Sequence, residues 1–439
     1  MNNFKKFSFI AILYCHALYG DIGFGPGKIG YNNAVPKEFW TIKQLADGKF
    51  IVVGDYGSNN NSGSVIVRFT QEGLLDTTFG QPNGYVNDDF DATRDDKLLD
   101  VVETTDHTLL VAGETGEDTL IAKYSQAGIR DLGYGNNGNN GDNGGKLTFN
   151  FVNNGIDKFW QIHELQDGKI VVCGSTSETN GKGLLAKINP DSLSDGGFGD
   201  GGFLEFANAV TFRGMVVLAN GTIVVTGHER KNNTNHAVIA QFNGNGQIDG
   251  NFGANGHTNF FVGQTAESNA LRKTQDGKFI VVGSYGGNAG RGFVARFTSQ
   301  GALDASFGSS SGFTGLPQSY LFWDCMIDQQ ERIIAVGRTA SSDNNTSVGI
   351  VARFLSNGQL DTTFGVNGSA LCAQVVVLRG ITITQDQKII VCGDGKDNKG
   401  HVIALNADGS INSASNWNLT TYRNVNKSEG LSIGLLSAR

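Results

Sequence analysis

The chain has 439 residues, with 34 lysines and arginines against 42 aspartates and glutamates, a formal net charge of −8. Because the net charge is negative and the basic residues form no stripe along the sequence, we do not expect nucleic acid as a partner. The 62 glycines against 5 prolines indicate many tight turns. The hydrophobic share of 39% is low but gathers in short strand-like runs, which argues against disorder.

The first 20 residues are typical of a secretory signal peptide. Lys5 and Lys6 form a short positive region, residues 7–14 form an apolar run, and residues 15–20 offer two cleavage sites. We predict that the mature protein begins between about Leu18 and Asp21. The protein is then exported to the periplasm, the cell surface or the medium.

Two other interpretations of this segment stay open. The apolar run could be a buried first strand, or Cys15 could carry a lipid anchor, although the bulky Tyr14 before it fits a lipoprotein signal poorly. The run is too short to span a bilayer comfortably, so we do not expect an integral membrane protein. The expected domains are a signal peptide at 1–20, a repeat domain at 21–422 and a C-terminal tail at 423–439.

One short phrase recurs along the chain. Asp-Gly-Lys-Phe-Ile-Val-Val-Gly occurs at Asp47–Gly54 and identically at Asp276–Gly283, and five variants occur elsewhere. The closing glycines of the seven copies stand at positions 54, 113, 174, 227, 283, 337 and 393, which are 59, 61, 53, 56, 54 and 56 residues apart. A nearly fixed step of this size indicates a repeat architecture.

Each copy predicts four short strands and no helix. In the first copy a strand at Phe39–Leu45 precedes a two-residue Asp-Gly hairpin turn, and the β-branched run after the turn is the second strand. A third strand at Ser64–Phe69 leads to a tail phrase, Leu-Asp-x-x-Phe-Gly, at Leu75–Gly80, and a fourth covers Gly84–Phe90. The pattern predicts an all-β, seven-bladed β-propeller of four-stranded antiparallel blades, with each first strand innermost.

The two phrases together resemble the delta-60 repeats, bacterial repeats grouped with the β-propellers, over about residues 21–415. Copy two departs from the tail phrase with Tyr134-Gly135, and copy seven departs further, with residues 411–417 in place of Phe-Gly. The resemblance implies a propeller. It implies no activity, because the family has no established common function.

The closure of the ring has two candidate segments. Asp21-Ile22-Gly23-Phe24-Gly25 matches a tail phrase detached from its repeat, and Lys28–Asn33 after it would form the outermost strand of blade seven. In that arrangement the N-terminus latches the ring onto its C-terminal blade. In the alternative, Trp417–Tyr422 completes blade seven.

We interpret the recurring acids and the cysteines as structural residues, not as a binding site. Six acids stand three residues before the Phe-Gly or Tyr-Gly that ends the tail phrase. This fixed place predicts that they cap a turn by accepting backbone N–H bonds: Asp76, Asp131, Asp195, Asp249, Asp304 and Asp361. After cleavage four cysteines remain, with no spacing that suggests a disulfide or zinc, so we expect buried free thiols: Cys173, Cys325, Cys372 and Cys392.

We find no pattern that supports catalysis, a metal site or a cofactor. The seven histidines are scattered, and no phosphate-binding glycine loop is present. The stretch Gly135–Gly145 holds one carboxylate, Asp142, too few for a calcium loop, so a flexible insertion is the better interpretation.

One position in the first strand carries the candidate binding residues. It lies seven residues before the hairpin Asp or its equivalent and holds three of the four tryptophans: Trp40, Leu99, Trp160, Arg213, Asn269, Trp323 and Arg379. Lining the channel, aromatic faces and guanidinium groups could stack against sugars or hold an anionic group. The alternative is that the tryptophans pack as wedges between blades. We call these seven the ring residues.

We expect an exported, monomeric, non-enzymatic binding module that recognises a protein or a glycan through one face. The segments that vary most between copies share that face: 55–63, 87–96, 175–182, 228–235 and 338–347. The alternatives are a propeller enzyme of the lyase, lactonase or glycosidase type and a purely structural surface protein. A cluster of perturbed carboxylates or histidines at one channel mouth would favour the enzyme.

Overall fold

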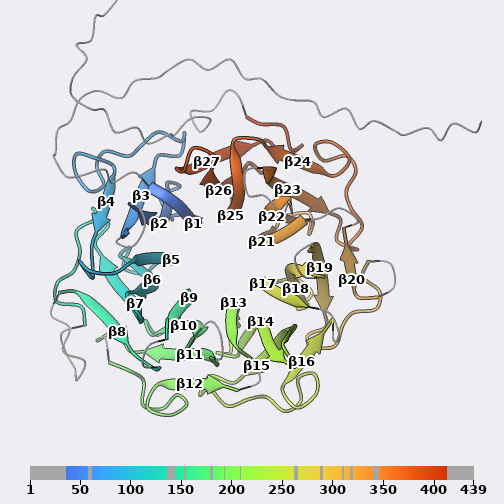
Figure 1. Ribbon diagram of the computed structural model, residues 1–439, viewed down its shortest axis with the longest axis horizontal. Helices are drawn as coiled ribbons and strands as arrows, with labels where there is room; N and C mark the ends of the chain where they lie inside the picture. The colour runs from blue at the N-terminus through green and yellow to red at the C-terminus, as the bar shows by residue number, and fades with distance from the viewer. Residues whose placement is uncertain are drawn as a thin grey trace, which may run out of the picture.

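Seven antiparallel sheets stand around a common axis in the computed structural model, which confirms the predicted seven-bladed propeller (Figure 1). The structure describes residues 36–57, 62–135, 144–152, 155–177, 181–191, 193–207, 209–261, 265–286, 290–308, 311–316, 320–339 and 346–412. Within these ranges there is no helix long and apolar enough to cross a membrane. The predicted signal peptide, both candidate closing segments and the C-terminal tail lie outside the described residues.

The first strand of each blade lies next to the channel, as expected, and pairs with the second (Figure 1). The first strands are β1 (Pro36–Gln44), β5 (Asp96–Glu103), β9 (Lys158–Glu164), β13 (Thr211–Val217), β17 (Ala266–Lys273), β21 (Tyr320–Ile327) and β25 (Val375–Ile383). The second strands are β2 (Phe50–Tyr56), β6 (Leu109–Thr115), β10 (Ile170–Ser175), β14 (Ile223–Lys231), β18 (Phe279–Tyr285), β22 (Ile333–Thr339) and β26 (Ile389–Gly395).

The third and fourth strands continue each sheet outward. The third strands are β3 (Gly63–Phe69), β7 (Asp118–Tyr124), β11 (Gly183–Ile188), β15 (Thr234–Phe242), β19 (Arg291–Phe297), β23 (Gly349–Phe354) and β27 (Gly400–Leu405). The fourth strands are β4 (Tyr85–Asp88), β8 (Lys146–Phe149), β12 (Phe203–Phe206), β16 (His257–Phe260), β20 (Phe313–Gly315) and β24 (Ser369–Cys372). Blade seven has three strands within the described residues.

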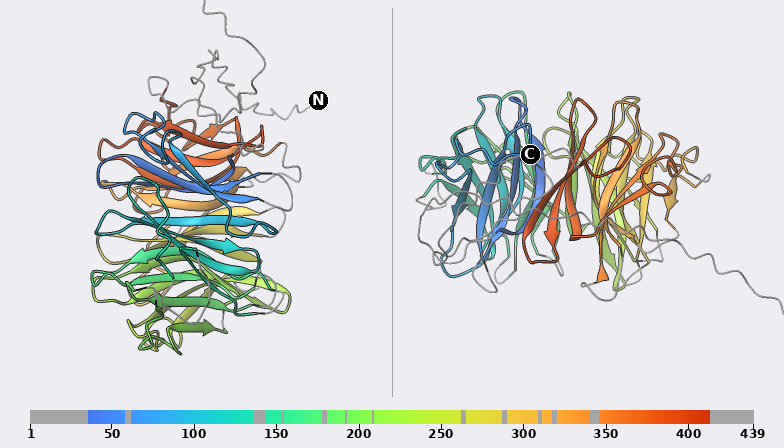
Figure 2. Two further views of the ribbon diagram at one scale, coloured as in Figure 1. Left: turned by 90° about the vertical axis from the view of Figure 1, so that its left-hand side faces the viewer. Right: turned by 90° about the horizontal axis from the view of Figure 1, so that it is seen from above.

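The strands run between the two faces of the disc, as its side views show (Figure 2). One face, the turn face, carries the hairpins between first and second strands and the loops of the tail phrase. The opposite face carries the segments after the closing glycines and the links between blades. We call it the variable-loop face.

The hairpin turns differ from the predicted two-residue type. In blade one the amide of Gly48 donates to the carbonyl of Leu45, and the amide of Leu45 donates to the carbonyl of Lys49. The loop therefore has three residues, and Gly48 at its end has a φ of +83°. A two-residue turn of the predicted kind needs positive φ at both central residues, and the Asp that precedes the glycine does not adopt it.

The core consists of seven apolar layers, one between each pair of neighbouring blades. Between blades seven and one, Phe39 and Val52 pack with Ile390 and Val402, so the ring closes through its core. Cys173, Cys325, Cys372 and Cys392 all lie in these layers as buried free thiols, as predicted.

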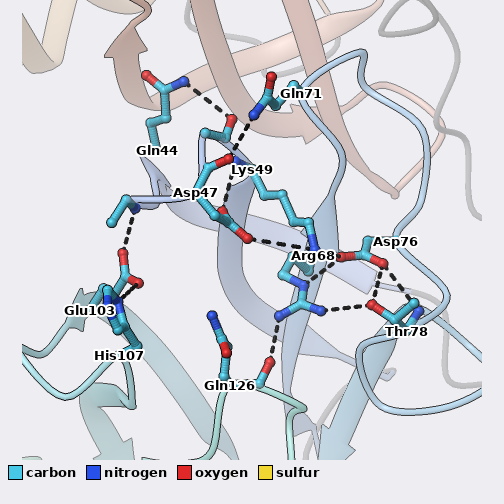
Figure 3. A network of polar contacts seen from close by, with 12 residues as sticks. Gln44, Asp47, Lys49, Arg68, Gln71, Asp76, Thr78, Glu103, His107 and Gln126 are labelled. Atoms are coloured by element: carbon cyan, nitrogen blue, oxygen red, sulfur yellow. Dashed lines mark hydrogen bonds and ion pairs between the residues drawn. The ribbon is translucent and has the colours of Figure 1, made fainter.

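A polar network on the turn face ties neighbouring blades together (Figure 3). Arg68 donates to Asp76 of its own blade and to the carbonyl of Gln126 in blade two, while its guanidinium lies 4.8 Å from the centre of the Phe79 ring. The Oδ1 of Asp76 accepts the amide of Thr78. The other five recurring acids cap the same turn in their own blades, which confirms that interpretation.

Candidate functional site at the channel mouth

Every ring residue is the extra residue of a β-bulge in its first strand. In blade one Phe39 pairs with Gly54 and Thr41 with Val53, so Trp40 has no partner in β2. The same shift occurs in each of the other six blades, at Leu99, Trp160, Arg213, Asn269, Trp323 and Arg379. A bulge re-aims the side chain that it carries. Here it turns seven side chains toward the channel.

The bulge also explains the invariance of the closing glycine among the seven copies. A Cβ on Gly54 would lie 1.9 Å from the carbonyl oxygen of Glu38, two residues before the ring residue. The corresponding distances in the other six blades are 1.8 to 2.0 Å. The closing glycine therefore leaves the space in which the first strand bulges.

The ring residues converge on the axis and contact one another across the channel. The indole of Trp40 lies 5.9 Å from that of Trp160 in blade three and 6.4 Å from that of Trp323 in blade six, both edge-on. Neither blade adjoins blade one, so the indoles cross the channel, and the alternative interpretation, in which they wedge between blades, is wrong. All seven ring residues line one axial cavity of about 60 Å³.

The two arginines of the ring lie between the indoles. Arg213 stands 5.4 Å from the Trp160 ring and 5.8 Å from the Trp323 ring, and Arg379 stands 3.9 Å from Trp40 and 5.4 Å from Trp323. Arg213 also donates to the amide oxygen of Asn269 over 2.8 Å. We call these indoles and guanidinium groups the axial cluster.

The residues after the ring position hold the axial cluster from below. Asp100 accepts the amide of Ile162 in the next blade, and Asp324 accepts that of Ile381. Asp100 pairs with Lys43 over 2.6 Å, and Asp324 with Arg272 over 2.7 Å. These links fix neighbouring first strands relative to one another, so the cluster rests on a rigid floor.

A rim of charged or titratable side chains surrounds the axial cluster on the variable-loop face. Each stands either two residues before a ring residue or directly after a closing glycine: Glu38, Asp55, Lys97, Glu114, Lys158, His228, Glu267, Arg338 and Asp394. Arg213 pairs with Glu267 over 2.9 Å, and Arg379 pairs with Asp394 over 2.6 Å and Glu38 over 3.5 Å. Most of the rim is thus paired with the cluster or with itself.

The rim contains strongly perturbed groups. Burial, and then the nearby Glu38, raises the pKa of Asp55 to about 7, and Asp55 is 1% exposed. Burial also raises the pKa of Asp394, although Arg379 opposes it. Burial, and then the charge of Arg213, lowers the pKa of His228 to about 4.

The structure brings together all six predicted binding residues, Trp40, Trp160, Arg213, Asn269, Trp323 and Arg379, with Leu99 beside them. The rim was missed, although the sequence carries a signal for part of it. The residue after the closing glycine is polar in all seven copies: Asp55, Glu114, Ser175, His228, Ser284, Arg338 and Asp394. A polar residue at the end of a buried strand in every copy points to one polar ring.

Metal binding finds no support in the described part of the chain, where no three His, Cys, Asp or Glu side chains are grouped to hold an ion. The glycine- and asparagine-rich stretch with Asp142 lies mostly outside the described residues. The arrangement at the mouth suits non-covalent recognition. It offers indole faces, guanidinium groups, and donors and acceptors fixed by ion pairs.

Five segments of the chain match the sequence-family model described as "Domain of unknown function (DUF5122) beta-propeller": residues 45–79, 165–198, 218–252, 274–307 and 332–364. They fall in blades one, three, four, five and six. The two blades without a match are those whose tail phrases depart from the pattern. The matches confirm β-propeller repeats at these residues. No curated protein sequence matches the chain.

Solved structures with a similar chain path include propellers of several kinds. The WD40 β-propeller domain of Doa1 is 12% identical, with a TM-score of 0.47 over 85% of this chain and 94% of that one. A polysaccharide lyase of family PL25, an ulvan lyase, is 8% identical, with a TM-score of 0.48 over 86% and 94%. A gluconolactonase from Xanthomonas campestris is 11% identical, with a TM-score of 0.35 over 69% and 84%. These likenesses carry no inference about function.

Proposed function

We propose that the protein is an exported, non-enzymatic propeller that binds a glycan at the channel mouth on its variable-loop face. The observation that carries this proposal is the meeting of three indoles and two guanidinium groups at the axis, inside a charged rim. Indole faces pack against sugar rings, and the rim supplies both donors and acceptors for hydroxyl groups.

The character of the variable-loop face favours a glycan over a protein. Among the large apolar side chains exposed in the described residues, Val152 and Ile156 are the two that stand in a link on this face. The core of a protein interface is usually apolar and depleted in charge. The mouth instead gathers charged groups around a small aromatic centre.

Export is supported by the Lys-Lys and apolar pattern of residues 1–20. A mass spectrum of secreted protein that begins between Leu18 and Asp21 would support export, and an intact Met1 would contradict it. The resemblance of the repeats to delta-60 repeats implies no particular ligand, so the site carries the proposal.

The double variant Trp160→Ala with Arg213→Ala tests the binding site. We expect it to lose binding on a glycan array and in calorimetry, because it removes one indole and the guanidinium stacked on it. The melting temperature should change little, since neither side chain belongs to an inter-blade layer. Lys388→Ala, which changes a half-exposed residue of the turn face, is the control. If the double variant unfolds and no ligand is found for the parent, the axial cluster serves packing and not binding.

A propeller enzyme is the second candidate, because the mouth contains the perturbed carboxyl that an acid–base mechanism needs. Asp55 has a pKa of about 7 and lies opposite Glu38 in the strand pair. Its 1% exposure argues against this candidate, because a substrate cannot reach its carboxyl. Release of new reducing ends from a bound polysaccharide by the parent, and its loss in Asp55→Asn, would establish the enzyme instead.

A further inference from the structure

The hairpin between β14 and β15 of blade four extends further on the variable-loop face than its counterparts. Its two strands have nine residues each, whereas the second and third strands of the other blades have six or seven in the described part of the chain. Asn232 and Asn233 at its tip have φ values of 51° and 60°, as a two-residue type I′ turn requires. Two extra residues per strand add about 7 Å to the height of the hairpin.

The end of this hairpin passes beyond the first strand of its own blade. β13 begins at Thr211, which pairs with His228, and the amide of Val210 before it donates to the carbonyl of His228. Because the backbone groups of a strand alternate between its two edges, the N–H and C=O of Arg230 also point to the inner edge of β14. No first strand lies beside them, and neither group has a hydrogen-bond partner among the described residues.

A cavity of about 380 Å³ lies between this hairpin and blade three. We call it the side cavity. Gly181 and Ala207 line it from blade three, and Glu229, Arg230, Asn232 and Asn233 line it from the hairpin. Cavities that bind small molecules usually enclose about 300–1,000 Å³. The side cavity is of that size, whereas the axial cavity of about 60 Å³ is too small to enclose a sugar ring.

Glu229 brings a free acceptor to the side cavity. Val225 packs in the layer between blades three and four, and Glu229, four residues further along β14, lies on the same face of the sheet, toward blade three. Its Oε1 accepts from the Nδ2 of Asn259 over 2.9 Å and lies 3.5 Å from the Nδ1 of His236. Its Oε2 has no hydrogen-bond partner among the described residues.

The rest of the hairpin adds donors and further acceptors. Asn232 and Asn233 are exposed, and a side-chain amide both donates and accepts. The backbone of Arg230 adds one N–H and one C=O at the inner edge of β14. A sugar hydroxyl also donates and accepts, so this mixture of groups suits a sugar better than an apolar ligand.

A short series of contacts joins the hairpin to the axial cluster. Arg213 of the cluster pairs with Glu267 over 2.9 Å, and Glu267 accepts from the side chain of Asn235 over 2.8 Å. Asn235 stands directly opposite Arg230 in the hairpin. Opposite residues of an antiparallel pair are about 5 Å apart, so a glycan that contacts the axial cluster can also reach the side cavity.

We propose that the side cavity holds one sugar unit of a glycan whose neighbouring units lie over the axial cluster. The Oε2 of Glu229 accepts from a hydroxyl of this unit, and the N–H of Arg230 donates to one of its oxygens. The ligand is then a chain of at least two units, bound along blade four, and its end does not enter the channel. This subsite deepens the proposed function and rests on it for the ligand class.

The dependence of affinity on chain length tests the arrangement. The full chain is titrated by calorimetry with neutral oligosaccharides of one to six units, in separate series built from glucose, galactose, mannose and N-acetylglucosamine. In a series that binds, the affinity of the parent should rise at least tenfold from one unit to the shortest chain that spans both places, because the second contact is then intramolecular.

Two variants assign this gain to the side cavity. Ala207→Trp places a bulky ring in the cavity, and Glu229→Gln replaces the free acceptor with a donor while keeping an oxygen for Asn259. Each should weaken the binding of the longer chains by about tenfold. The melting temperature of Ala207→Trp should stay unchanged, because Ala207 is exposed. Ala92→Trp, the same change at an exposed residue of the link between blades one and two, is the matched control and should bind as the parent does.

The outcomes separate the side cavity from the axial cluster. An Ala207→Trp variant that binds the longer chains as the parent does overturns the side subsite, while binding at the axial cluster stands. An affinity that does not change with chain length overturns it as well. Weakened binding by Ala207→Trp together with unchanged binding by the double variant Trp160→Ala with Arg213→Ala supports the side cavity and counts against the axial cluster. A parent that binds no member of any series overturns both.

Discussion

Asp55 and Glu38 face each other directly across the β1–β2 strand pair, so two carboxyl groups share one side of the channel mouth. The Oδ1 of Asp55 accepts the indole N–H of Trp40, and the side chain is fully buried. Burial is the main cause that raises the pKa of Asp55 to about 7, and Glu38 adds to it. The two carboxyl groups therefore repel each other when both are ionised, so their repulsion depends on pH.

Asp55→Asn should remove part of the pH dependence of stability. Because the pKa in the folded state exceeds the ordinary value of 3.8, the folded protein holds a proton that the unfolded chain releases between about pH 4 and 7. The free energy of unfolding therefore falls as pH rises through this window. Asn stays neutral and keeps an acceptor for Trp40, so we expect the variant to be more stable than the parent above pH 7.

Melting temperatures between pH 4 and 8 check this prediction, with Asp200→Asn, an exposed residue, as the control. Some slope should remain in the variant, because burial raises the pKa values of Asp96 and Asp157 to about 6. Parent and variant curves that run parallel over the whole range would contradict the role given to Asp55.

Gly174→Ala should destabilise the protein, because the new Cβ would lie 1.8 Å from the carbonyl oxygen of Lys158. The bulge that carries Trp160 and the closing glycine occupy the same space, so one of them must move. Overpacking of this kind costs about 1–3 kcal/mol, and the contact here is with backbone, which yields little. Chemical denaturation measures the loss.

Gly250→Ala is the matched control, because a Cβ at Gly250 meets nothing within 4 Å. Equal stability of the two alanine variants would show that the closing glycine is not what admits the bulge. Loss of glycan binding by Gly174→Ala at unchanged stability would instead show that the bulge serves only the site.

The blade count and the inner position of each first strand could be predicted because the closing glycine repeats, as at Gly54 and Gly283. The position of Trp40 could be found by aligning the copies. The bulge could not be predicted, because the extra residue is identified only when the pairing of β1 with β2 is known. The hairpin was predicted one residue too short, because an Asp-Gly pair also fits a longer loop that ends in glycine.

The contacts across the channel mouth could not be predicted from the sequence, for a different reason. Arg379 reaches Glu38 because blade seven packs on blade one, and the two residues lie near opposite ends of the chain. Trp40 meets Trp323 because both bulges aim at one axis. Such contacts depend on the closure of the ring and on side-chain direction, which no local pattern records.

Phe307→Ala should cost about 3–5 kcal/mol of the free energy of unfolding, since the ring is completely buried. The ring lies under the guanidinium of Arg296 and against Gly358 of the next blade, so its loss opens a cavity between blades five and six. Urea denaturation gives the magnitude. Leu132→Ala, 60% exposed in the tail phrase of blade two, should cost far less. Similar losses for the two would refute the packing role.

The contacts of the tail phrase also indicate how the ring is latched. In five interfaces a Phe of one blade lies against the glycine of the next blade's turn, where a Cβ would meet the ring: Phe79 on Gly128, Phe198 on Gly246, Phe252 on Gly301, Phe307 on Gly358 and Phe364 on Gly409. Blade one has the matching Gly73, and the one Phe-Gly of the sequence outside these five is Phe24-Gly25. We therefore expect Phe24 to pack on Gly73 and residues 28–33 to pair with β27.

Deletion of Asp21–Ala34 should then lower the melting temperature and promote self-association, because blade seven has three strands in the described residues and the edge of β27 would stay open. Phe24→Ala should lose stability on the scale of Phe307→Ala while the strand still pairs, so it should stay monomeric. Calorimetry and light scattering report the two effects separately. A deletion variant as stable and monomeric as the parent would assign the closing strand to Trp417–Tyr422, because an unpaired edge cannot be exposed at no cost.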